Sequence, residues 1–188
     1  MFAAFVLIVA ALAAPAPQER QSRTPRTDET VAVAKGARLT VDNFAGEVVI
    51  KAWDRDSLRV QAMHNSRTKV NIRTTPSGVV VRAQHEQAPT SVDYEISVPA
   101  WMPVRVVGTY NFINVEGTQS EVSAETTRGD VTVRGGTGVT AKSIEGEVVV
   151  DGARGRIVAS SVNEAVRITA ASGEITVETT NGDITFTR

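Results

Sequence analysis

The chain has 188 residues, of which 41% are hydrophobic and 22% charged, so a globular fold is possible and disorder as the main state is excluded. A formal net charge of −1 disfavours a general nucleic-acid binder and a polybasic membrane-surface protein. The absence of Cys excludes disulfides and thiol nucleophiles, and only His64 and His85 could supply an imidazole. These counts leave little room for catalysis.

The first 14 residues have the pattern of a secretory signal peptide. Residues 2–14 form an unbroken apolar run, shorter than the about 20 residues that span a bilayer, and Ala11-Leu12-Ala13 supplies a small-x-small cleavage pattern. No Lys or Arg precedes the run, so a buried N-terminal helix is the alternative. The polar residues 15–28, with three prolines, predict a flexible linker. We expect an exported protein of the periplasm, cell surface or extracellular space, whose mature chain has no membrane span.

Residues 29–110 are strand-rich but irregular. Alternating apolar residues predict strands at 29–34, 38–44, 47–53, 57–62, 69–74, 78–83, 94–98 and 104–107. The pair at 69–74 and 79–83 fits an antiparallel hairpin around a Pro-Ser-Gly turn. Val48 and Ile50 already follow the pattern of the later repeats. This region is expected to form an opening coil plus antiparallel strands that cap one end of the domain.

A nine-residue repeat begins at Asn111. The units start at Asn111, Ser120, Gly129, Thr137, Gly146, Gly155, Glu164, Gly173 and Gly182, with one spacing of eight. In every unit the second and fourth residues after the start are apolar, from Ile113 and Val115 to Ile184 and Phe186. This alternation predicts a short strand with one buried face, and the period predicts a turn after each strand.

The units are of two kinds, so the true repeat is about 18 residues. The second apolar residue is Ala in the units starting at Ser120, Thr137 and Gly155, and is larger in those starting at Gly129, Gly146, Glu164 and Gly182. One small-residue strand and one large-residue strand per repeat predict two facing sheets with a shared core. The expected fold is therefore all-β: a right-handed parallel β-solenoid of two-strand coils, capped by an N-terminal antiparallel strand region. One domain would span 29–188, with the cap at 29–110 and regular repeats at 111–188.

Three sequence features carry a resemblance to a known family. They are N-F-A-G-E-V-V-I-K-A-W-D at 43–54, S-V-P-A at 97–100, and the repeated N/E-G-D/E-[VI]-x-[VF] units. They resemble a bacterial family of β-strand-repeat domains of unknown function, the putative adhesins, similar to autotransporter-adhesin-like head domains. The resemblance covers 30–188 and implies an exported adhesin-like β-solenoid. Its motifs are architectural, so no functional residue carries over from it.

Acidic side chains follow the unit starts and are the main candidates for chemistry. They are Glu121, Asp130, Glu147, Glu174 and Asp183. Asp130 and Glu147 would stack about 5 Å apart on adjacent coils, where they could bind Ca²⁺ or resemble the carboxylates of polysaccharide lyases and hydrolases. The alternative is a solvated outward row, favoured because Ala165 interrupts it and arginines lie nearby. We therefore expect no catalytic, cofactor-binding or metal-binding residue and no cofactor.

Other chemically capable residues have structural explanations that we favour. His64 and His85 lie on different predicted strands without flanking ligands. Ser160-Ser161 lacks a nucleophile-elbow motif, and residues 134–138 read as a tight corner rather than a Ca²⁺ or phosphate loop. The rings that could stack on sugars all precede the regular repeats and are expected in the cap and core: Trp53, Tyr94, Trp101 and Tyr110. The repeats themselves hold Phe112 and an inward Phe186, which make no aromatic stripe.

Three functions remain open. The favoured one is a non-catalytic exported envelope protein, an adhesin-like or scaffold β-solenoid. The second is an accessory or sensory module that pairs with a partner through a strand edge. The third is a β-helical polysaccharide-active enzyme, disfavoured because the eight- or nine-residue spacing leaves no room for cleft-forming loops. The partner is an unknown protein or surface polymer rather than a nucleic acid, and the last strand edge is a candidate for self-association.

The signal-peptide prediction is testable by intact-mass measurement of the protein recovered from its host. Because the apolar run ends in Ala11-Leu12-Ala13, we expect a mature N-terminus between Ala14 and Gln18. An uncleaved chain in the cytosol would contradict export.

Overall fold

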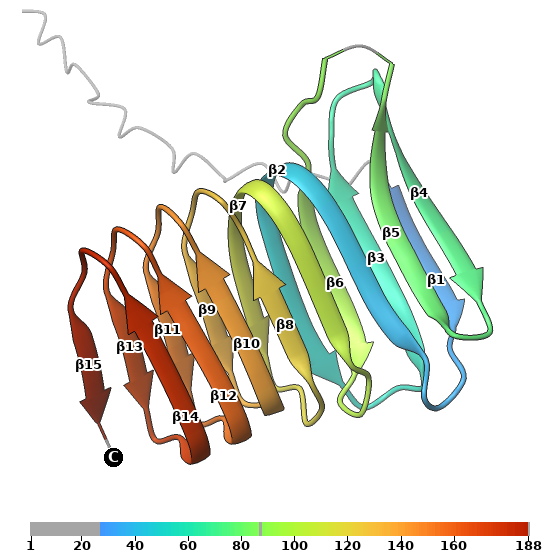
Figure 1. Ribbon diagram of the computed structural model, residues 1–188. Helices are drawn as coiled ribbons and strands as arrows, with labels where there is room; N and C mark the ends of the chain where they lie inside the picture. The colour runs from blue at the N-terminus through green and yellow to red at the C-terminus, as the bar shows by residue number, and fades with distance from the viewer. Residues whose placement is uncertain (1–26, 87, 188) are drawn as a thin grey trace, which may run out of the picture.

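The computed structural model describes residues 27–86 and 88–187. The predicted signal peptide at 1–14 and most of the predicted linker lie outside the described residues. The described chain is all-β, with fifteen strands joined into one mixed, mostly parallel sheet that does not close on itself (Figure 1). In this part of the chain there is no helix of the length and apolarity needed to cross a membrane.

The strands follow one another without intervening helices. They are β1 (Thr27–Ala32), β2 (Arg38–Trp53), β3 (Ser57–Met63), β4 (Thr68–Thr75), β5 (Gly78–His85), β6 (Asp93–Pro99), β7 (Val104–Glu116), β8 (Val122–Glu125), β9 (Val131–Arg134), β10 (Thr137–Ser143), β11 (Val148–Asp151), β12 (Arg154–Ser161), β13 (Val166–Thr169), β14 (Ser172–Thr179) and β15 (Ile184–Thr187).

Two parallel ladders run along the molecule and are named here A and B. Ladder A contains the first halves of β2 and β7, followed by β8, β10, β12 and β14. Ladder B contains the second halves of β2 and β7, followed by β9, β11, β13 and β15. Val131 pairs with Val148 and Val148 with Val166, steps of 17 and 18 residues (148 − 131 and 166 − 148). The predicted repeat and its division into two kinds of strand are thus confirmed, and we call one strand from each ladder a layer.

Strands β2 and β7 each run through both ladders, which the sequence did not predict. The expected strands at 38–44 and 47–53 are one strand, and the expected strand at 104–107 continues into the first repeat. Gly46 lets β2 turn from one ladder into the other without breaking. Its φ is +118°, and a Cβ there would lie 2.3 Å from the Val92 carbonyl oxygen, so only glycine fits.

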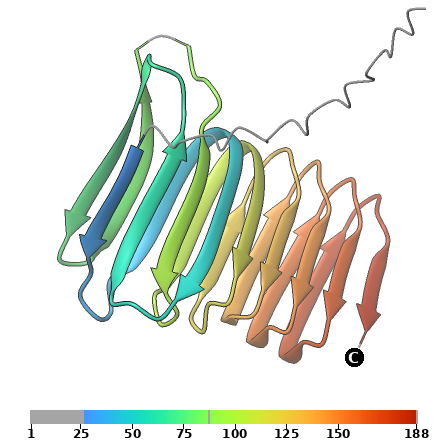
Figure 2. The same cartoon turned by 180° about the vertical axis from the view of Figure 1, so that it is seen from behind.

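The N-terminal strands lie at one end of the two ladders, as the sequence predicts (Figure 2). Beside β2, ladder B continues into β6, β3 and β1, with antiparallel pairing between β6 and β3 and between β3 and β1. Ladder A continues into β5, which forms the predicted antiparallel hairpin with β4. The edge strand β1 begins at Thr27, two residues before the predicted domain start at 29. Arg59 clamps it through Asp28 (Nε–Oδ1 2.8 Å, Nη2–Oδ2 2.6 Å), and this contact lowers the pKa of the Asp28 carboxyl.

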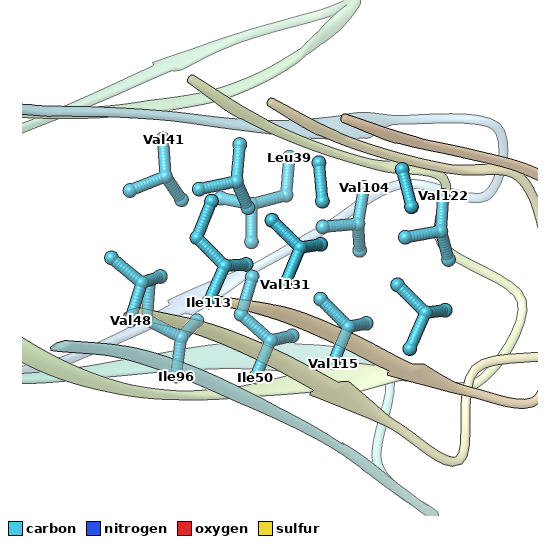
Figure 3. Close-up of a cluster of buried hydrophobic side chains, with 14 of the residues drawn as sticks. Leu39, Val41, Val48, Ile50, Ile96, Val104, Ile113, Val115, Val122 and Val131 are labelled. Carbon is cyan, nitrogen blue, oxygen red and sulfur yellow. The ribbon is translucent and has the colours of Figure 1, made fainter. Parts of the chain in front are cut away.

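The hydrophobic core fills the space between the two ladders. Figure 3 shows Leu39 and Val104 of ladder A across this space from Ile50 and Val115 of ladder B. The predicted inward residues are buried in seven of the nine units: Ile113, Val115, Val122, Ala124, Val131, Val133, Val139, Ala141, Val148, Val150, Ile157, Ala159, Val166 and Ile168.

The last layer departs from this pattern. Phe186, expected to be an inward core residue, is 45% exposed, and Ile184 beside it is 51% exposed. Phe186 does hold the register position that Ile168 holds one layer earlier. Among the described residues, however, no further strand lies beyond β15 to cover it.

The strand register can be tested with two adjacent substitutions in β11. Val148→Asp places a carboxylate in a fully buried position, so we expect it to cost about 3–5 kcal/mol of unfolding free energy. Val149→Thr changes a half-exposed outward side chain and should cost less than about 1 kcal/mol. Urea melts that ranked the two variants in the opposite order would contradict the register.

Candidate binding site

In each layer the chain passes from ladder A to ladder B through a five-residue bend, and the bends stack on one another. We call this stack the corner; its segments are 43–47, 108–112, 126–130, 143–147, 161–165 and 179–183. Backbone hydrogen bonds tie neighbouring bends, for example Arg128 N–H to the Thr109 carbonyl at 2.8 Å and Glu145 N–H to the Thr127 carbonyl at 2.8 Å.

A row of hydroxyl side chains lines the inside of the corner. Ser143 Oγ donates to the Gly129 carbonyl and Ser161 Oγ to the Gly146 carbonyl, both at 2.9 Å. These carbonyls turn inward at the bend, where a buried acceptor without a partner would destabilise the fold. The row is structural, and the sequence reasoning missed it. Its signal was a Thr or Ser two residues after the Ala of each small-residue strand, as in Ala141-Lys142-Ser143.

Two buried asparagines lie at the corner where the cap meets the repeats: Asn43 holds the hydroxyl position of its bend, and Asn111 holds the position that glycine holds at 46. Asn43 Nδ2 donates to Asn111 Oδ1 at 2.7 Å and to the Val92 carbonyl at 2.9 Å, while Asn111 Nδ2 donates to the Asn43 carbonyl at 2.9 Å. A Cβ on Gly108 would lie 2.2 Å from Asn111 Nδ2, so this glycine makes room for the amide. Since each Asn precedes a phenylalanine, this network fixes the backbone that carries Phe44 and Phe112.

Three aromatic rings gather on the outside of the corner. Phe44 is 40% exposed, Tyr110 44% and Phe112 58%; we call these three residues the aromatic corner. The rings of Phe44 and Tyr110 meet edge to face, with centroids 5.4 Å apart and planes at 70°. The register of β2 against β7, which pairs Ala45 with Tyr110, brings together residues 66 positions apart (110 − 44).

An arginine side chain contacts one ring of the aromatic corner. The Arg128 guanidinium lies 5.7 Å from the centre of the Tyr110 ring, within cation–π range. Arg128 also forms an ion pair with Glu145 in the next layer, and the hydrogen bond between them raises the pKa of Arg128. Further along the corner, Ile144 (47% exposed) and Val162 (39%) extend the apolar surface.

An open groove of about 380 Å³ begins beside Phe44. It lies between the β4–β5 hairpin and the corner, and its lining is Asp42, Asn43, Phe44, Arg82, Ala83, His85, Pro89, Val107, Gly108 and Thr109. Arg82 and Asp42 form an ion pair at 2.7 Å within it. His85 Nδ1 lies 3.1 Å from Thr68 Oγ1 and accepts a hydrogen bond from Thr90 N–H at 3.4 Å.

The predicted carboxylate pair is adjacent, but each member has a structural partner. Asp130 Oδ1 accepts a hydrogen bond from Glu147 N–H at 2.8 Å, and the Glu147 carboxylate pairs with Arg167 Nε at 2.6 Å. Glu121 pairs with Arg38 at 3.6 Å. Within residues 27–86 and 88–187, no three His, Asp or Glu side chains come together as metal ligands would.

The remaining candidates occupy structural positions. His64 contacts Thr27 Oγ1 through Nε2 at 2.8 Å and so ties β1 to the cap. Ser161 is buried and donates to a backbone carbonyl, which leaves it no role as a nucleophile. Residues 134–138, predicted to form a tight turn, lie outside the corner defined above. All three of their glycines have positive φ.

The four aromatic residues predicted to lie in the cap and core have different outcomes. Tyr94 is a core residue, and burial raises the pKa of its hydroxyl. Trp53 and Trp101 donate their indole N–H groups to the Ser57 carbonyl at 2.7 Å and to Asp56 Oδ1 at 2.9 Å within the cap. For Tyr110 the prediction was wrong, because its ring lies on the surface with Phe44 and Phe112.

Comparison with family models and with curated proteins finds no match. Among solved structures, the chain is similar to a putative cell adhesion protein from Clostridium sporogenes, at 10% identity and a TM-score of 0.47, over 87% of this chain and 99% of that one. It is also similar to putative adhesins from Bacteroides fragilis (10%, 0.38, over 85% and 96%) and Parabacteroides merdae (8%, 0.28, over 85% and 95%). These are proteins of the kind that the sequence resembles.

The structural role of the acidic row predicts the behaviour of a triple variant. Replacing Asp130, Glu147 and Asp183 with the corresponding amides should leave the fold intact, because the amide side chain at position 130 keeps an oxygen that can accept the Glu147 N–H bond. In the unmodified protein, Ca²⁺ should shift the melting temperature no more than a nonspecific salt does. A rise of several degrees at sub-millimolar Ca²⁺ would instead support a metal site on this row.

Proposed function

We propose that this chain is a non-catalytic, exported protein of the cell envelope, which uses a right-handed β-solenoid as an adhesin-like or scaffold element. The observation that carries the proposal is the aromatic corner. The rings of Phe44 and Tyr110 lie exposed in edge-to-face contact, and Phe112 is exposed two residues further along β7, so burying these rings in a complex would remove apolar surface from water.

The frame beneath the aromatic corner suits binding without rearrangement. The Asn43–Asn111 network and the paired β2 and β7 strands hold the rings from below. Edge-to-face contact orients Phe44 and Tyr110 before any ligand arrives, so little side-chain freedom is lost on binding.

The contacts of the carboxylates favour binding over catalysis. Acid–base chemistry on a sugar needs two carboxyl groups that face one cleft with separate roles. Asp130 and Glu147 instead engage a backbone N–H and an arginine, and neither lines the groove beside Phe44.

Export is supported by the sequence alone. The apolar run at 2–14 and the small-x-small pattern at 11–13 are typical of a cleaved signal peptide, and the chain has no Cys to suffer oxidation outside the cytosol.

A second candidate function, an accessory module that pairs through a strand edge, is favoured by one observation. Ile184 and Phe186 on β15 are about half exposed, and β15 pairs only with β13 among the described strands. The last layer also carries Glu174, Glu178 and Asp183 but no Lys or Arg in 172–187. Like charges would oppose each other in a complex of two copies, so a basic partner strand fits this edge better than self-association does.

The adhesin-like function predicts retention on a surface without turnover. Beads carrying the full chain should adhere to the envelope of the host or of a neighbouring cell, and the Phe44→Ala/Tyr110→Ala/Phe112→Ala variant should lose most of this adhesion. Met63→Ala, which removes an exposed apolar side chain of β3 outside both proposed binding surfaces, is the matched control and should adhere normally. Equal adhesion by all proteins would contradict the assignment to the aromatic corner. Release of soluble sugars from the surface would contradict a non-catalytic role.

A further inference from the structure

The groove beside Phe44 is lined by apolar and polar side chains together. Its apolar side chains include Phe44, Pro89 and Val107, and its polar ones include Asp42, Arg82 and His85. Asp42 pairs with Val107 on one side and with Arg82 on the other, so the two kinds of side chain are neighbours. The groove volume of about 380 Å³ lies at the small end of the range for small-ligand sites. A ligand that fills the groove must therefore present an apolar face and a polar edge in one compact unit.

The charges in the groove are balanced before a ligand arrives. Arg82 and Asp42 neutralise each other at 2.7 Å, and Arg128 at the neighbouring corner is neutralised by Glu145. An anionic ligand would have to compete with these carboxylates, and a cationic ligand would have to compete with the guanidinium groups. A neutral ligand has no such cost.

The polar side chains of the groove offer donors and acceptors close together. Asp42 accepts hydrogen bonds, Arg82 has several N–H donors in a planar fork, and the His85 ring also lines the groove. Adjacent hydroxyl groups can donate to a carboxylate and accept from a guanidinium at the same time. An Asp–Arg pair is therefore well matched to two neighbouring hydroxyls on one ring.

Phe44 supplies an aromatic ring to the groove. The face of an aromatic ring carries partial negative charge, which attracts the C–H groups that cover one side of a pyranose ring. The edge-to-face contact with Tyr110 orients the Phe44 ring before a ligand arrives. Tyr110 and Phe112 continue the exposed aromatic surface around the corner, beyond the groove.

We infer that the groove and aromatic corner bind a neutral glycan, with one pyranose unit stacked on Phe44 and its hydroxyl groups hydrogen-bonded to Asp42 and Arg82. This inference rests on the proposed binding function and specifies its ligand. Further sugar units of the same oligosaccharide lie along Tyr110 and Phe112.

The test uses the full chain and an array of neutral oligosaccharides: β-linked glucans, mannans, galactans and N-acetylglucosamine oligomers. We expect binding to at least one class, little changed by added salt because the ligand is uncharged. For that oligosaccharide, calorimetric titration should show an affinity loss of about tenfold or more for Phe44→Ala and for Arg82→Gln. Met63→Ala, a change outside the groove and the aromatic corner, should bind as the unmodified chain does.

A conservative variant separates a glycan from a protein partner. Phe44→Leu keeps apolar volume but removes the ring face, so glycan binding should fall nearly as far as with Phe44→Ala. A protein partner would tolerate leucine much better, and its capture would resist periodate and be lost on protease treatment of the target surface. That pattern would overturn the glycan inference.

The array and the bead assay fail in different ways. Beads that adhere through the aromatic corner while the array shows no binding would overturn the glycan ligand and leave the proposed function standing. Array binding that is unchanged in Phe44→Ala and Arg82→Gln would also overturn the site. If neither beads nor array show binding, the proposed function itself fails.

Discussion

Close stacking of backbone at the corner is the constraint on which the rest of the structure depends. Parallel strands in neighbouring layers lie about 4.8 Å apart, and the chain must turn from one ladder to the other within that spacing. A Cβ on Gly146 would lie 2.1 Å from the Gly129 carbonyl oxygen, and one on Gly182 would lie 2.0 Å from the Glu164 carbonyl oxygen. Glycine at these bends therefore permits both the spacing and the register, and the register in turn places every inward side chain.

The same register explains why the corner has two different surfaces. Inside, carbonyls exposed by the bend require donors, and the hydroxyl row supplies them in successive layers. Outside, side chains project away from the core and make no contribution to it, so their identity is free to serve binding. The aromatic corner lies where the bonded pair Asn43 and Asn111 stands in the bends in place of a hydroxyl, at the junction of the cap and the repeats.

Most of the fold was predictable from the sequence, because the alternation of inward apolar and outward residues from Ile113 to Ile168 indicates which side chains are buried. The continuity of β2 was not predictable. Gly46 lies in the middle of an alternating apolar segment, and such a glycine is as typical of a turn between two strands as of a bend within one. The aromatic corner was missed for a different reason. Phe44 and Tyr110 belong to segments whose pairing is fixed only when β2 and β7 align, and local periodicity carries no information about that alignment.

The corner also gives the molecule a modular length. In the layers after β7, each five-residue bend begins with a Thr or Ser hydroxyl, and each layer contacts only its neighbours. Duplication of a 17- or 18-residue segment within the repeats could therefore add a layer without altering the cap or the aromatic corner. Each added layer would move the last strand about 4.8 Å further from the aromatic rings. In evolution or in design, the distance between a ligand held at one end and a partner held at the other could thus be adjusted in small, equal steps while both surfaces stay unchanged.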